Sequence, residues 1–160
     1  MPFYMQVTGL EELITRMGTL EDKGVDIASA ALYEGAGIMA DAVTKAVQGI
    51  VTEEFRYTKH GQRLPSPEEK ALILSARRGV TKFKKSKTSV ETSIGFQKSG
   101  YGDLGGKTRP IPVVANSIES GTSFMKPQPF FRTAVEKTAP TAAGVIEGGI
   151  ESRFNQLSLD

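Results

Sequence analysis

The stretch that most resembles a binding motif is the glycine-rich run GYGDLGGKT at Gly100–Thr108. A phosphate-binding Walker A loop needs a glycine, four residues and then Gly-Lys-Ser/Thr, followed by a helix. Counting back from the Gly-Lys-Thr at 106–108, the required glycine position is occupied by Tyr101. An Arg-Pro pair and a strand-like run then follow where a helix is needed. We therefore interpret the run as a connection between strands, and a small nucleotide-binding enzyme is a less favoured function.

Other residue types that carry catalysis are scarce. The chain has no cysteine and one histidine, His60, which lies in the polar stretch YTKHGQR. A transition-metal site would need almost all its ligands from carboxylates. The acidic pairs at 11–12, 53–54 and 68–69 are sequence neighbours, and such neighbours do not face each other on a helix. We predict that the protein is not an enzyme and that it has no catalytic residue, metal or cofactor.

A basic segment, RRGVTKFKKSK at Arg77–Lys87, contains six cations and no acid, which leaves 14 basic and 18 acidic residues elsewhere. Its cations are Arg77, Arg78, Lys82, Lys84, Lys85 and Lys87. A solvated loop is the simplest interpretation, and the alternatives are contact with an acidic protein surface or with nucleic acid phosphates. With Phe83 interleaved, the segment makes a nucleic-acid-binding module the alternative function.

The chain has 160 residues, and 39% of them are hydrophobic. This length and composition predict one domain over 1–160. Its start lacks a basic region followed by an apolar run, and no stretch approaches the roughly 18 apolar residues of a membrane span. We therefore expect no membrane partner and synthesis in a cytoplasm.

The N-terminal half predicts a strand, a short helix and a long helix. Apolar and polar residues alternate over 3–7, as in a half-buried strand. Thr8 and Glu11 form a capping box before a short helix over about 10–17. From Val25 to Ile50, apolar residues recur every three or four positions, which predicts a long helix whose alanines and glycines allow another backbone to approach closely.

The second half predicts strands framed by helices. Ser66, Pro67 and Glu69 mark a helix start, and Gly79 is its predicted end. Alternation predicts strands at 90–96 and 111–115, joined antiparallel by the glycine-rich run. A final helix follows from Pro129, and Pro140 is expected to kink or break it. The predicted fold is α+β: an antiparallel sheet of three or four strands packed against the long helix and the C-terminal helix.

The stretch IESGTSFMKPQPFFRTA at 118–134 is the most distinctive in the chain. We expect a strand to stop at Gly121 with unusual backbone angles, and Thr122 or Ser123 to bond neighbouring amides. Two prolines stiffen the corner, with Pro129 in the first turn of the final helix. Phe130 and its neighbour at 131 are predicted to point to different sides, one into the core and one toward a partner; the alternative is that both are intramolecular.

These features together resemble the tail-completion family of long-tailed bacteriophages, particularly the minor tail protein Z type. Members commonly run through a Glu-Phe-Gly-Thr turn into an Ala-x-Pro-Phe start of the last helix. The corresponding residues here are Glu119-Ser120-Gly121-Thr122 and Pro129-Phe130-Phe131-Arg132. The likeness covers both ends of the chain. Ser120 stands where an aromatic residue is usual, and a basic insertion at about 52–87 replaces a Pro-x-x-Thr-Gly-x-Leu stretch.

The resemblance implies a structural virion protein at the head–tail junction, or neck, which completes the tail or connector for joining. Copies would form a homo-oligomeric ring, a hexamer by resemblance, between the head connector or head-closure protein and the tail terminator or tail tube protein. DNA passing through the channel is a further candidate partner. The residues implied at interfaces or in shaping the subunit are Glu119, Gly121, Thr122, Pro129, Phe130, Phe131 and Arg132.

Overall fold

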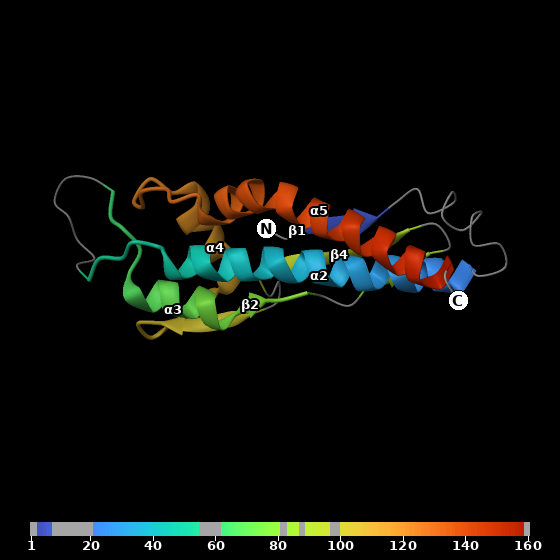
Figure 1. Ribbon diagram of the computed structural model, residues 1–160. Coiled ribbons are helices and arrows are strands. Elements are labelled where there is room, and N and C mark those ends of the chain that lie inside the picture. Colours follow the sequence, from blue (N-terminus) through green and yellow to red (C-terminus); the bar gives the residue numbers. More distant parts are fainter. Residues whose placement is uncertain are drawn as a thin grey trace. The chain divides into compact units, whose positions relative to one another are not determined.

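The computed structural model describes residues 3–7, 21–54, 62–80, 83–86, 89–96 and 100–158. Contacts divide the chain into two compact units. We call residues 41–78 and 95–137 the corner unit, and residues 3–40, 79–94 and 138–160 the helix-pair unit. Figure 1 labels three of the elements: α2 (Glu21–Gln48), β4 (Val90–Phe96) and α5 (Phe130–Ser158). Each of the three contributes residues to both units. The prediction of a single domain over 1–160 stays a prediction.

In the helix-pair unit, the first part of α2 packs closely against the second part of α5. The Ile146 side chain lies where a Cβ on Gly35 would point, and Gly149 approaches Ala31. Arg153 forms an ion pair with Glu34 across the same two helices. The small residues of α2 therefore permit the close helix approach that the sequence predicts.

The sheet of the helix-pair unit is built around β4. β1 (Phe3–Val7) pairs with it antiparallel from Phe3 opposite Ile94 to Val7 opposite Val90, and the short β3 (Lys84–Lys85) pairs on the other side. In the corner unit, β2 (Arg77–Arg78) pairs antiparallel with the last residues of β4. The four strands form one sheet, and the α+β prediction with a long helix and a C-terminal helix is confirmed.

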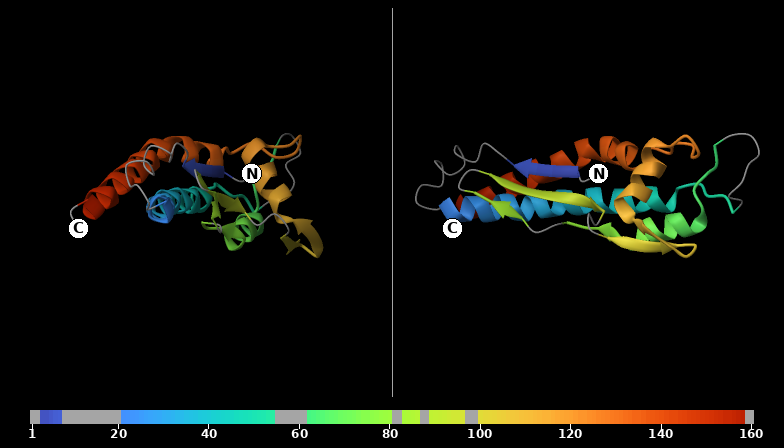
Figure 2. Two further views of the ribbon diagram at one scale, coloured as in Figure 1. Left: turned by 90° about the vertical axis from the view of Figure 1, so that its right-hand side faces the viewer. Right: turned by 180° about the vertical axis from the view of Figure 1, so that it is seen from behind.

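The corner unit also contains α3 (Pro67–Ser75), α4 (Ile111–Ser120) and a hairpin of β5 (Tyr101–Leu104) and β6 (Lys107–Pro110) (Figure 2). The predicted capping box of α3 is confirmed, since Ser66 accepts from the Glu69 amide and Glu69 accepts from the Ser66 amide. The predicted end at Gly79 is wrong: α3 ends at its cap Ala76, because the chain then enters β2.

The predicted strand at 111–115 is wrong, because Ile111–Ser120 is a helix. Its buried apolar residues are Ile111, Val114, Ala115 and Ile118, which have helical spacing, whereas Val113 is exposed. The glycine-rich run consequently does not join the two predicted strands. It forms its own hairpin, turning at Gly105 and Gly106, both with positive φ.

The final helix continues through Pro140, so the predicted break is absent, and the predicted kink stays a prediction. Proline removes one helical hydrogen bond and crowds the carbonyl four residues earlier, here that of Glu136. Both residues are exposed, so water can reach the unpaired carbonyl. The predicted short helix at 10–17 and its Thr8–Glu11 capping box lie outside the described residues.

Candidate assembly site

The corner between α4 and α5 begins at Gly121, which caps α4 with φ 74° and ψ 171°. This backbone region is open essentially to glycine alone. A Cβ on Gly121 would also lie 2.9 Å from the Met125 carbonyl oxygen and 2.9 Å from Pro127 Cδ. The unusual backbone angles predicted at Gly121 are therefore present, but the element that ends there is a helix, and the prediction of a strand is wrong.

A tight turn follows at 122–125. The Thr122 hydroxyl accepts hydrogen bonds from the amides of Phe124 at 3.2 Å and Met125 at 3.0 Å. The backbone amide of Thr122 donates to the Met125 carbonyl at 2.9 Å. Met125 is buried, whereas Phe124 is exposed. The predicted bonding of Thr122 to neighbouring amides is confirmed, and it fixes the turn locally.

Two distant segments brace this turn within the corner unit. The Arg63 amide donates to the Phe124 carbonyl at 2.8 Å, and the Lys126 amide donates to the Arg63 carbonyl at 2.9 Å. The Gln128 side chain accepts from the Val51 amide and donates to the Val51 carbonyl. Arg63 is itself held by an ion pair with Glu69 at 2.7 Å. The corner is therefore fixed by several parts of the chain.

Glu119 joins the end of α4 to the start of α5. Its carboxylate accepts hydrogen bonds from the Phe131 amide at 2.8 Å and the Arg132 amide at 3.0 Å. Amides in the first turn of a helix lack partners within the helix, and a negative charge there is favourable. Because Glu119 is buried, it caps α5 from another helix, and these two bonds are a physical basis for its predicted role in shaping the subunit.

Replacing Glu119 with alanine is expected to lower the free energy of unfolding by about 2 to 3 kcal/mol, because two amides lose their acceptor and one of them is buried. Urea unfolding measures this change. Glu136→Ala is the matched control, since Glu136 is an exposed glutamate on α5. Equal stability of the two variants would show that the carboxylate does not hold the corner.

Phe130 and Phe131 are both buried, at 8% and 6% exposure. Their ring centroids lie 6.0 and 6.1 Å from that of Phe96, and 6.5 Å from each other. The prediction that one of them faces a partner is wrong in this structure, because the three rings form one cluster in the corner unit. Pro129 and Arg132, beside them, are exposed.

The structure describes the predicted basic patch only in part, so the patch stays a prediction. Arg77 and Arg78 form β2 in the corner unit, Lys84 and Lys85 form β3 in the helix-pair unit, and Lys82 and Lys87 lie outside the described residues. Lys85 Nζ lies 3.6 Å from an Asp26 carboxylate oxygen, and Lys84 is opposite Glu91. These acids offset charge that a nucleic acid would need, so we propose no second function.

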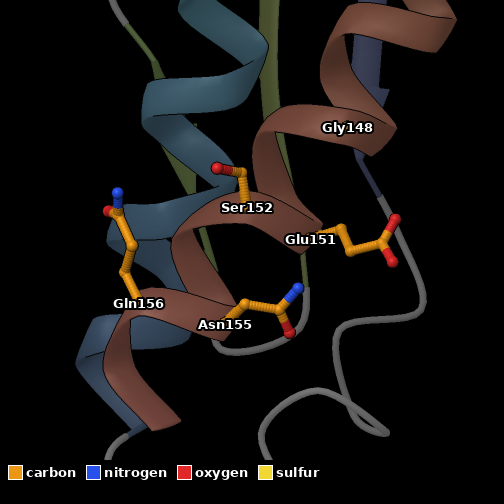
Figure 3. Close-up of a pocket in the computed structure, with 5 residues that line it drawn as sticks. All are labelled: Gly148, Glu151, Ser152, Asn155 and Gln156. Atoms are coloured by element: carbon orange, nitrogen blue, oxygen red, sulfur yellow. The ribbon is translucent and has the colours of Figure 1, made fainter. Parts of the chain in front are cut away.

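A shallow hollow on α5 is lined by Gly148, Glu151, Ser152, Asn155 and Gln156. Figure 3 shows their side chains fanning out from the helix, with Glu151 and Gln156 pointing in different directions, so no convergent binding site results. In the part of the chain that the structure describes, no cluster of three or more His, Asp or Glu residues could hold a metal ion. None of the described helices is long and apolar enough to span a membrane.

Comparison with known proteins gives no match to a family model, a curated protein or a solved structure. The likeness to the tail-completion family therefore rests on the residues at the two ends of the chain.

Proposed function

We propose that this chain is a structural virion protein that forms a ring at the head–tail junction of a long-tailed bacteriophage. The ring completes the tail or the connector so that the two can join. Its neighbours are the head connector or head-closure protein on one side and the tail terminator or tail tube protein on the other. The proposal includes no catalysis and no cofactor.

The observation that carries this proposal is the construction of the corner. The residues that resemble the family, from Glu119 to Arg132, are the ones that fix the path from α4 to α5. Glu119 caps α5, Gly121 adopts a conformation reserved for glycine, and Thr122 closes the turn. A ring closes only if each subunit repeats the same angle between its two contact surfaces. A rigid corner supports this requirement.

Mass measurement of the purified chain, alone and mixed with the head connector or tail tube of the phage that encodes it, tests the proposal. We expect a discrete closed oligomer, six copies by resemblance, alone or on one of these partners. A chain that stays monomeric alone and with both partners would contradict it. The basic segment would then be tested by nucleic acid binding at increasing salt.

A further inference from the structure

Phe124 is a solvent-exposed aromatic residue on a hydrogen-bonded turn. It is 76% exposed, more than any other exposed large hydrophobic residue in the described ranges. Its amide is bound by the Thr122 hydroxyl and its carbonyl by the Arg63 amide. A mobile loop could fold this ring onto the surface, whereas this turn keeps it projecting. Aromatic anchors that are fixed before binding are typical of interface centres.

A second exposed apolar surface lies elsewhere on the corner unit. Tyr101 is 68% exposed and is the register partner of the half-buried Pro110 across the hairpin. Val113, 59% exposed, lies one turn into α4, just after Pro110. Gly102 faces Leu72 of α3, so Tyr101 and Asp103, which alternate with it on β5, point away from α3. We call Tyr101, Pro110 and Val113 the hairpin patch.

The two surfaces lie at opposite ends of α4. Pro110 immediately precedes this helix and Gly121 immediately follows it, with Phe124 in the next turn. Ten helical residues span about 15 Å, so Phe124 does not cover the hairpin patch of its own chain. Two different patches at the two ends of one element are what head-to-tail association of identical subunits requires. One kind of contact, repeated between successive copies around a ring, would bury both surfaces of every copy.

The charges beside the two surfaces are complementary. Lys126 is exposed and lies two residues after Phe124, on the other side of the buried Met125 in the sequence. Asp103 is exposed and shares the face of Tyr101 on β5. In each segment, an aromatic residue is followed two positions later by a charged residue: Phe124 by Lys126, and Tyr101 by Asp103. The two charges are opposite, so they are complementary.

We propose that Phe124 of one copy packs on the hairpin patch of the next copy, with Lys126 facing Asp103 across the contact. The inference rests on the proposed ring and names the surfaces that close it. The occupant is a second copy of this chain, because both halves of the contact are present on one subunit.

Concentration-dependent mass measurement on the full chain tests this contact. We expect Phe124→Ala and Tyr101→Ala each to raise the concentration at which copies associate by about tenfold or more. Lys126→Glu or Asp103→Lys alone is expected to weaken association, and the double variant K126E/D103K to restore most of the loss. Thermal unfolding of these variants is expected to match that of the unaltered chain. Tyr33→Ala is the control, since Tyr33 is an exposed aromatic residue of the helix-pair unit.

The outcomes separate this contact from the ring itself. If the unaltered chain forms the ring and Phe124→Ala forms it equally well, the contact is wrong and the ring stands. The same holds if both charge variants weaken association but the double variant is no better than either. If the unaltered chain never associates, alone or with its phage partners, both the contact and the proposed function are wrong.

Discussion

Gly121→Val is expected to lower the free energy of unfolding by about 2 to 6 kcal/mol. Its φ of 74° with ψ of 171° is a conformation that costs a residue with a side chain about 1 to 3 kcal/mol. The new side chain would also meet the Met125 carbonyl oxygen and Pro127, each 2.9 Å from its Cβ. Overpacking of this kind costs about 1 to 3 kcal/mol more. The two terms add because the turn has no space in which to relax.

Substitutions at two other glycines help to separate the backbone cost from the overpacking cost, and denaturant unfolding measures both. Gly106 also has a positive φ, 79°, but a Cβ there meets nothing within 4 Å, so Gly106→Val measures the cost of a positive φ without the added contacts. Gly37 lies in α2 with open space around its Cβ, and Gly37→Ala is expected to stabilise the helix by up to about 1 kcal/mol. A Gly121→Val variant as stable as the unaltered chain would mean that the corner does not need this glycine.

Phe130→Ala and Phe131→Ala are each expected to lower the free energy of unfolding by about 3 to 5 kcal/mol. Both rings are buried and both contact Phe96, so truncating either one leaves a cavity in the corner unit. Because stability at this level decides whether a small domain folds, we expect both variants to lose assembly together with structure.

Phe124→Ala is the matched control, since Phe124 is an aromatic residue of the same segment that is exposed. Thermal unfolding of the three variants is expected to show two large decreases and one unchanged midpoint. A decrease for only one of Phe130 and Phe131, with loss of assembly but not of stability for the other, would instead restore the prediction that one ring faces a partner.

The elements that the sequence predicts correctly are those specified by neighbouring residues. The capping box of α3 needs only Ser66, Pro67 and Glu69, and the structure forms it. The strands β1 and β4 follow from strict alternation, and α2 from an apolar stripe sustained over many turns. In these cases local preference and tertiary packing agree.

The errors occur where the apolar residues of a short run fit both the two-residue period of a strand and the 3.6-residue period of a helix. Ile111, Val113 and Ala115 alternate, whereas Ile111, Val114, Ala115 and Ile118 follow a helix, and only burial decides between them. The helical spacing and the prolines at 110 and 112 were signals for a helix start. The adjacent glycines at 105 and 106 were the signal for a two-residue hairpin turn.

The candidate site was predictable in its residues but not in its contacts. Glu119 bonds amides 12 and 13 residues away, and Arg63 meets Phe124 from a distant segment. Such pairings depend on the tertiary path of the chain, which periodicity does not contain. The exposure of Phe124 has the same origin, because Met125, its neighbour, is the residue that becomes buried.

The most direct test of the account is the fraction of tailed particles formed when the purified chain is added to heads and tails that were assembled without it. We expect the unaltered chain to convert separate heads and tails into joined particles. Heads and tails that join equally well without the chain, or that remain separate when the folded chain is supplied, would contradict a role in completing the head–tail junction.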